Sequence, residues 1–142
     1  MATRCLTPRI ARVSYVPPAP KADLIDETFA EGFASDWIAS WNAHDLDRVL
    51  AHYIEDMEMS SPVIVQIAGE PSGRLRGKAA VRAYWARALK LVPDLKFELL
   101  SVLVGVDSVT LFYVGAYGRL AAEVFHFGAD RRVVKAFAHY VS

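Results

Sequence analysis

Cysteine and long apolar runs are nearly absent from this chain of 142 residues. The single Cys5 has no partner for a disulfide within the chain, which fits a reducing cytoplasm. No apolar stretch approaches the roughly 20 residues that a helix needs to span a bilayer. The 16 basic and 16 acidic residues cancel, so no net field attracts nucleic acid or an anionic membrane. We therefore expect a cytoplasmic protein with no nucleic-acid and no membrane partner.

Motifs for bound metals, phosphates and serine nucleophiles are also missing. "GRLRGKA" has one residue too few between its glycines for a phosphate-binding loop, and Ala79 stands where that loop requires Ser or Thr. No G-x-S-x-G sequence places a serine nucleophile, and one cysteine cannot build a zinc site. Metal-ligand spacing is lacking among the histidines, which are His44, His52, His126 and His139. The sequence therefore predicts neither a metal nor a cofactor.

Acidic residues are absent from the first 22 positions, which hold four of the seven prolines. Arginines and prolines interrupt "LTPRIARVSYVPPAP", where a secretory signal would need an apolar centre of about 7 to 15 residues. We interpret residues 1–22 as an irregular, Pro-rich basic arm, and a targeting role is the alternative. Residues 23–142 have the length of one domain with a real core.

From Asp23 onward the apolar residues recur at helical spacing. An aromatic and aliphatic stripe marks one side of a long helix: Ile25, Phe29, Phe33, Trp37 and Trp41. Asn42 suits the end of this helix, and Asp45 can act as the N-cap of a short second one. That second helix is expected to bury Leu46, Val49, Leu50 and Tyr53. A third helix is predicted from Lys78 to about Val92, where Pro93 ends it.

Between the helices, "EMSSPVI" at residues 58–64 raises the question of what a pocket would do with two serines and no carboxylate. A short strand is expected from Met57 to Pro62, which Val63 to Ile67 could continue, and a glycine-rich loop follows. Four runs rich in β-forming residues complete the chain: Leu95–Val104, Val109–Ala116, Arg119–Phe127 and Val133–Val141. Turn residues separate them, which predicts an antiparallel meander.

Two of these runs, "LLSVLV" and "VTLFYV", are apolar at nearly every position. Helices can cover one face of the meander, but antiparallel sheets normally expose alternating polar residues on the other face. A second copy of the chain is the simplest cover for an apolar outer face. We therefore expect a homodimer that packs sheet to sheet. Merely hydrophobic outer strands are the alternative.

Three stretches carry a resemblance to a known superfamily: "DWIASWNAHDLDRVLAHYIEDMEMSSPV", "SGRLRGKAAVRAYWARALKLVPDLKFEL" and "VFHFGADRRVVKAFAHY". From about residue 23 the chain resembles the nuclear transport factor 2-like superfamily, in its branch of ketosteroid isomerases and SnoaL-like polyketide cyclases. The resemblance implies an α+β fold, a cone-shaped α+β barrel. Three helices pack on a curved, mostly antiparallel sheet, in the order helix, helix, strand, helix, four strands. It also implies an apolar pocket inside the cone, although this fold hosts many unrelated functions.

The catalytic groups of the isomerases are only partly present. Ser61 stands where they carry an aspartate base, and a hydroxyl cannot abstract a carbon-bound proton unaided. Trp37 stands in the slot of their tyrosine on the first helix, and Ala138 in the slot of an aspartate of some cyclases. Glu123 matches the aspartic acid that donates a hydrogen bond to the oxyanion. The isomerase mechanism therefore does not transfer to this chain as a whole, and Glu123 is the candidate catalytic residue.

Strand alternation decides whether Glu123 enters the pocket. It should share a face with Phe125 and Phe127, and with Val134, Ala136, Ala138 and Tyr140 of the last strand. A carboxyl in an apolar cone should have a raised pKa, because its charged form is poorly solvated there. The alternatives are an ion pair of Glu123 with Arg119, or a register slip that brings His126 and His139 inside instead.

The other expected lining residues are Trp37, Tyr53, Ser61, Tyr84, Phe97, Phe112, Val114, Phe125, Ala136, Ala138 and Tyr140. Plain core packing is the alternative for each of them. The sequence thus favours a small apolar-molecule pocket, for a polyketide-like or steroid-like ligand. Its chemistry would be a cofactor-independent isomerisation, cyclisation or dehydration by Glu123, with Tyr53, Ser61 and Tyr140 orienting the ligand. A non-catalytic binding protein and a protein-interaction domain are the alternatives.

Overall fold

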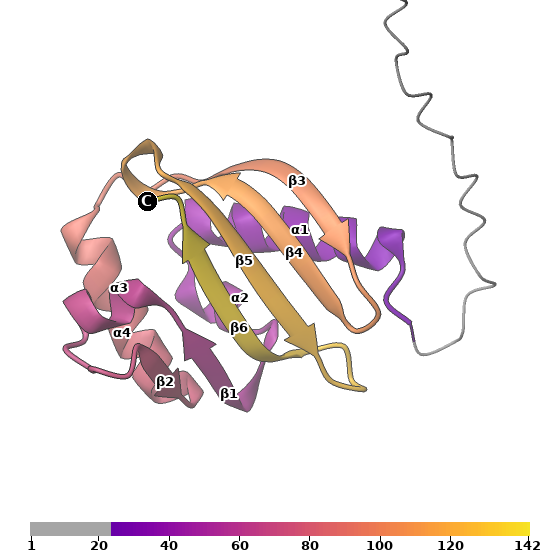
Figure 1. The fold of residues 1–142 in the computed structure, drawn as a ribbon, viewed down its shortest axis with the longest axis horizontal. Helices are drawn as coiled ribbons and strands as arrows, with labels where there is room; N and C mark the ends of the chain where they lie inside the picture. Colours follow the sequence, from indigo (N-terminus) through magenta and orange to yellow (C-terminus); the bar gives the residue numbers. More distant parts are fainter. Residues whose placement is uncertain (1–23) are drawn as a thin grey trace, which may run out of the picture.

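The computed structural model describes residues 24–142, so the predicted arm of residues 1–22 lies outside the described residues. This part of the chain holds four α-helices, one 3-10 turn and six strands (Figure 1). The helices are α1 (Glu27–Asn42), α2 (Leu46–Leu50), α3 (Pro62–Ile67) and α4 (Lys78–Leu91), and the 3-10 turn is η1 (Ala116–Gly118). The strands are β1 (Tyr53–Ser60), β2 (Arg74–Arg76), β3 (Glu98–Val104), β4 (Ser108–Val114), β5 (Leu120–Phe127) and β6 (Val133–Tyr140).

The strands form one sheet in the order β2-β1-β6-β5-β4-β3. β1 and β6 run parallel, and every other neighbouring pair in this sheet is antiparallel. The sheet is curved and open, with α1 and α2 across one face and α3 and α4 beside β1 and β2 (Figure 1). The predicted α+β cone with a mostly antiparallel sheet is therefore confirmed, with one helix more than the three expected.

The long helix α1 packs as its sequence predicts, but it begins at Glu27 and not at Asp23, where the helical pattern was expected to start. Asp26 is its N-cap, because the carboxylate accepts a hydrogen bond from the backbone N–H of Phe29 at 2.7 Å. The predicted stripe is its buried side, where Phe33, Trp37 and Trp41 are each 5% exposed or less. Asp45 caps α2 in the same way, by accepting from the backbone N–H of Arg48 at 3.1 Å. Both helix starts are thus fixed by short acidic side chains.

The prediction was wrong around "EMSSPVI". Tyr53 does not belong to the second helix but begins β1, where it pairs with Val133 of β6. Segment 62–67 does not continue the strand and forms helix α3 instead. The reason is local: the Ser61 hydroxyl accepts a hydrogen bond from the backbone N–H of Val63 at 3.1 Å. Pro62 occupies the first helical position, where its missing N–H costs nothing.

The first strand of the meander starts at Glu98, three residues later than predicted. The residues just before Glu98 bond instead to side chains at the end of α1. The Asn42 amide donates to the carbonyl of Phe97 at 3.0 Å and accepts from the Phe97 N–H at 2.7 Å. His44 donates from Nε2 to the carbonyl of Leu95 at 2.8 Å. These backbone groups therefore bond to side chains and not to a neighbouring strand. The glycine-rich loop likewise contains a short edge strand, β2, paired with β1.

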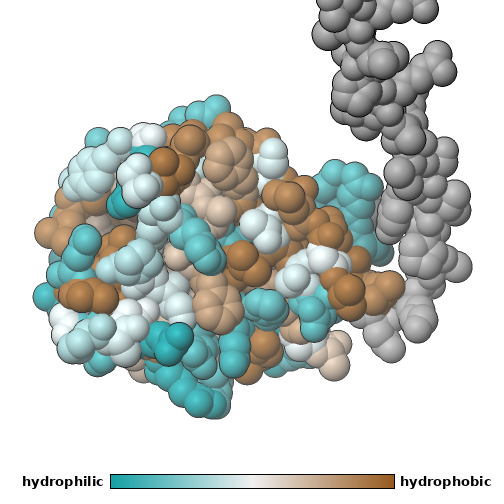
Figure 2. Space-filling view, in the orientation of Figure 1, coloured by the Kyte–Doolittle hydropathy of each residue, from teal (hydrophilic) through white to brown (hydrophobic). Residues whose placement is uncertain are grey.

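Strand alternation separates a helix-covered face from an outer face. On β4, Val109, Leu111 and Tyr113 are at most 3% exposed and face the helices. Thr110 and Phe112, between them, point to the outer face and are only half-buried. Figure 2 views this outer face and shows apolar and polar side chains mixed on it, with apolar ones gathered toward β3 and β4. None of the described helices combines the length and apolar character that crossing a membrane requires.

Candidate functional site: an apolar cavity with one buried carboxyl

A cavity of about 350 Å³ lies between the helices and the helix-covered face of the sheet. Trp37 and Trp41 of α1 and Tyr84 and Trp85 of α4 supply aromatic walls. The turn around η1 contributes the rim, including Tyr117, whose side chain is 86% exposed. The volume lies within the range of roughly 300 to 1,000 Å³ that small-molecule pockets occupy.

Among the described residues that line the cavity, Glu123 is the single carboxylic acid. It lies in the middle of β5, paired with Leu111 of β4 and Ala138 of β6. The side chain is 4% exposed, and its Oε2 atom is buried without a hydrogen-bond partner. Burial raises the pKa of the Glu123 carboxyl from 4.5 to about 8, because the anion is poorly solvated there. At neutral pH this group is mostly the neutral acid and can donate a proton.

Four buried tyrosines lie near enough to this carboxyl to interact with its charge, and three of them, Tyr84, Tyr113 and Tyr140, line the cavity. Burial is the main reason that the pKa values of Tyr53, Tyr84, Tyr113 and Tyr140 are all raised. A negative charge on Glu123 raises each of these pKa values further, so the five groups interact electrostatically. All four phenols therefore keep their protons at neutral pH. The three that line the cavity offer hydrogen-bond donors to a ligand without adding a charge.

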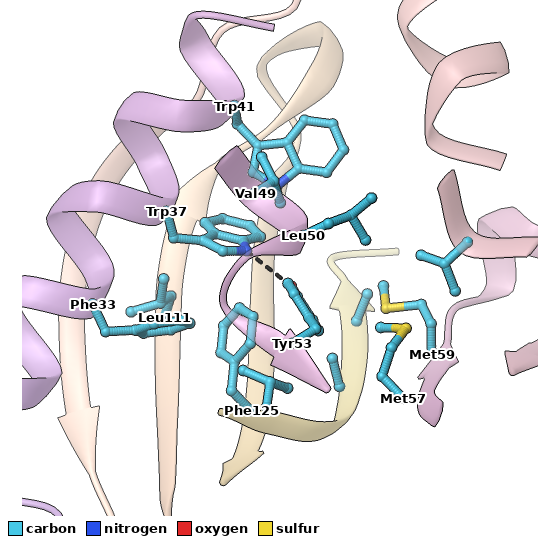
Figure 3. Close-up of a cluster of buried hydrophobic side chains, with 14 of the residues drawn as sticks. Phe33, Trp37, Trp41, Val49, Leu50, Tyr53, Met57, Met59, Leu111 and Phe125 are labelled. Carbon is cyan, nitrogen blue, oxygen red and sulfur yellow. Dashed lines mark hydrogen bonds between the residues drawn. The ribbon is translucent and has the colours of Figure 1, made fainter. Parts of the chain in front are cut away.

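The indole N–H groups of two tryptophans of α1 differ in their hydrogen bonding. Trp37 Nε1 donates to the Tyr53 hydroxyl at 3.0 Å, and both side chains are at most 1% exposed (Figure 3). The Trp37 donor is thus satisfied within the protein, and it fixes the Tyr53 ring. The Nε1 atom of Trp41, one turn further along α1, is buried and has no partner. Trp41 and Glu123, which both line the cavity, therefore each carry one buried polar atom without a hydrogen-bond partner.

Ser61, which stands where the ketosteroid isomerases carry an aspartate base, has a structural role. Its side chain is 3% exposed and caps α3 through the bond to Val63 described above. Its hydroxyl also interacts with Tyr84 and Tyr140, which lowers their pKa values slightly against the effect of burial. It does not line the main cavity but a shallower hollow of about 270 Å³ that also includes Ala138. The serine therefore positions neighbours of the cavity without facing it.

The structure brings only some of the predicted lining residues to the cavity. Those in its wall are Trp37, Tyr84, Phe97, Glu123 and Tyr140. Tyr53, Phe125 and Ala136 are buried on the same side of the sheet, but they lie behind the wall in the core. The ring of Phe125 packs edge-on against Phe33 and Trp37, at 4.9 and 5.2 Å between centroids.

The prediction that Phe112 and Val114 line the pocket is wrong, because both residues lie on the outer face of the sheet. Leu111 pairs with Glu123, so the neighbouring Phe112 pairs with Ala122 and points the opposite way. Val134 is also outward, because an irregularity between His126 and Phe127 pairs Phe127 with Val133. The wall residues that the sequence reasoning missed include Trp41, Tyr113 and Arg119. The aromatic stripe already contained Trp41, and a correct register for β4 would have identified Tyr113.

The alternative ion pair of Glu123 with Arg119 does not form. Arg119 Nε donates to the carbonyl of Val141 at 3.0 Å, and the guanidinium carbon lies 5.0 Å from the centre of the Tyr140 ring. His126 and His139 lie on the outer parity of their strands, away from the cavity. Within residues 24–142 no three metal-ligating side chains gather at one place.

Comparison with known proteins gives the family. Residues 34–140 match the SnoaL-like domain. The chain belongs to the SnoaL-like domain family. A crystal structure of a SnoaL-like protein of unknown function from Burkholderia thailandensis E264 is 64% identical, with a TM-score of 0.81. That match covers 84% of this chain and 99% of the other. No curated protein matches the chain.

More distant structures share the SnoaL-like fold. A candidate ketosteroid isomerase from Kribbella flavida is 14% identical with a TM-score of 0.63, covering 80% of this chain and 78% of its own. SalBIII, an epoxide hydrolase/cyclase-like enzyme of pyran ring formation in the polyether salinomycin, is 17% identical with a TM-score of 0.63. It covers 82% of this chain and 93% of its own. At these identities the likeness establishes the nuclear transport factor 2-like fold.

Proposed function

We propose that this SnoaL-like protein binds a small, mostly apolar molecule in the cavity and moves a proton on it with Glu123. One observation carries the proposal: a buried carboxyl lies in the cavity wall with its Oε2 atom unpartnered. Leaving a buried polar atom without a partner costs roughly 1 to 3 kcal/mol, which a ligand oxygen would recover on binding.

The protonation behaviour of Glu123 fits acid–base catalysis. A pKa of about 8 makes the acid form dominant at neutral pH and keeps the base form accessible. The acid form can donate to a carbonyl or hydroxyl oxygen of the ligand, and the carboxylate can remove an activated C–H proton. Isomerisation, cyclisation and dehydration of an apolar ketone or alcohol all use such transfers. The isomerase and cyclase chemistry of the structural neighbours is consistent with this class of reaction.

The other polar groups of the cavity would orient the ligand. Trp41 offers an unused N–H, and Tyr113 and Tyr140 offer neutral hydroxyls near the carboxyl. Tyr53 would act indirectly, since its ring is fixed by Trp37 in the layer behind the wall. Ser61 would position Tyr84 and Tyr140 and would leave the ligand to them. The proposal uses no metal and no cofactor.

A base-catalysed ring opening tests the proton transfer without knowledge of the natural substrate. We use 5-nitrobenzisoxazole: a base removes its ring C–H proton, the N–O bond breaks, and a coloured cyanophenolate forms. The wild-type rate should rise with pH and level off above about 8, as the Glu123 carboxylate forms. Glu123→Gln should lower the rate by about 100-fold or more, within the usual range for a general base. The exposed Glu98→Gln should leave it unchanged.

A purely binding role is favoured by one observation, the presence of a single carboxyl and no second base in the cavity wall. The fluorescent probe N-phenyl-1-naphthylamine separates the two roles. If wild type and Glu123→Gln bind this probe alike but neither opens the benzisoxazole ring faster than buffer, the catalytic proposal is wrong and the binding role stands. If the probe does not bind at all, both fail, and a protein-interaction domain becomes the better description.

A further inference from the structure

Two ionisable groups of opposite type line the same cavity at different depths. Glu123 is buried in the middle of β5, and Arg119 stands exposed at the rim, just before that strand begins. Within residues 24–142, no other Lys, Arg, Asp, Glu or His belongs to the lining. The two ends of the cavity therefore differ chemically, with a carboxyl at the buried end and a single cation at the entrance.

The strand geometry sets the spacing between these two groups. Arg119 and Glu123 are four residues apart, so in an extended chain their side chains share one face and their Cα atoms are about 13 Å apart. A rigid apolar body of two fused rings is shorter than this span. Aromatic side chains of α1 and α4, including Trp41 and Trp85, line the same cavity.

Arg119 is held in place without being neutralised. Its Nε–H is bonded to the Val141 carbonyl, and its guanidinium lies over the Tyr140 ring. These contacts leave the two terminal amino groups, which are the pair that binds a carboxylate side by side. Among the described residues, Arg119 takes part in none of the ion pairs. An arginine fixed in this way loses little conformational entropy when it binds an anion.

We propose that the ligand is an amphipathic organic acid: its carboxylate pairs with Arg119 at the rim, its apolar body fills the cavity, and its far end presents an oxygen to Glu123 and Trp41. The inference rests on the proposed function for the cavity itself and adds the chemical class of the occupant. A neutral Glu123 suits such a ligand, because a carboxylate at the bottom of the cavity would repel an acid entering from the rim.

The test compares two ligands of the same shape, 2-naphthoate and 2-acetonaphthone, which differ by a negative charge. Each is titrated into the protein to displace N-phenyl-1-naphthylamine, at low salt and neutral pH. Wild type should bind the naphthoate about 10-fold more tightly or better, as expected for a charge-assisted pair. Arg119→Met should reduce that preference to within about 2-fold. Arg119→Lys should keep part of it, since a charge without the planar fork remains.

Arg87→Met is the matched control, because this arginine is exposed on α4, outside the cavity lining and the ion pairs. It changes the net charge equally and should preserve the preference for naphthoate. Equal affinity of wild type for the two ligands, or a preference that survives in Arg119→Met, would overturn the organic-acid inference. Retained binding of the naphthylamine probe would then show that the cavity proposal itself still holds. Replacement of the carboxylate by 2-naphthalenesulfonate, if bound equally well, would support Arg119 as a general anion anchor.

Discussion

At the scale of single residues, the behaviour of Glu123 follows from its neighbours along and across the strands. Alternation along "AAEVFHF" predicted that it shares a face with Phe125 and Phe127, and the family resemblance indicated that this face is the inner one; all three side chains are buried. The sequence could not show that Arg119 would bind a backbone carbonyl and leave the carboxyl alone, since that depends on where the chain end passes. It also could not place Phe112, because the register of β4 is set by partners on β3 and β5.

The buried carboxyl predicts a specific dependence of stability on pH. The folded chain holds this proton more tightly than the unfolded chain, since the native pKa is about 8 against 4.5. The contribution to the free energy of unfolding is therefore complete below pH 4.5 and declines as pH rises through 8. Between pH values of about 6 and 9 the loss should be roughly 2 to 3 kcal/mol.

Urea unfolding at pH values of about 6 and 9 measures this loss in the free energy of unfolding. Glu123→Gln has no proton to lose, so its stability should change less by that amount. The exposed Glu98→Gln should behave like the wild type. If the wild type and Glu123→Gln lose the same stability on going to the higher pH, the carboxyl is not the buried acid described above.

At the scale of elements, the start of α2 was predictable from its capping side chain, Asp45. The start of α1 was not, because the apolar spacing already includes Ile25, so the helical pattern runs from Asp23 although Asp26 caps a helix that begins at Glu27. Helix α3 was missed because all of its residues except Gln66 are β-branched or apolar and they lack a helical period, so only the Ser61–Pro62 pair marks it. The role of the Ser61 cap can be tested against the adjacent Ser60, whose hydroxyl has no hydrogen-bond partner.

Ser61→Ala removes the cap of α3 and should lower the free energy of unfolding by about 1 kcal/mol or slightly more. Ser60→Ala is the control: the Ser60 hydroxyl is buried without a partner, so its removal should be neutral or stabilising. Chemical denaturation of both variants gives the comparison. Equal losses for the two would mean that the hydroxyl at position 61 does not cap the helix.

At the scale of the whole molecule, the outer face of the sheet supports the expected homodimer as a proposal. Phe112, Val124 and Phe137 lie on this face, and Leu100 and Leu103 on the edge strand β3 are 44% and 55% exposed. Apolar area of this kind stabilises an isologous contact when a second copy covers it. We propose that two copies pack through this face.

Light scattering after gel filtration should give a dimer for the wild type and a monomer for Val124→Glu, which buries a charge in the middle of the interface. Ala80→Glu, on the exposed side of α4, should stay dimeric. Circular dichroism checks that each variant is folded. A wild-type monomer, or a dimer that survives Val124→Glu, would refute the sheet-to-sheet arrangement.

The position of β6 has a consequence for synthesis on the ribosome. This strand comes late in the chain, yet it lies between β1 and β5 and is what connects the two halves of the sheet. A nascent chain that stops before residue 133 would expose two unpaired strand edges, which invite pairing with other chains. The protein should therefore remain vulnerable to aggregation until its last strand leaves the exit tunnel, and truncations there should be far more damaging than their length suggests.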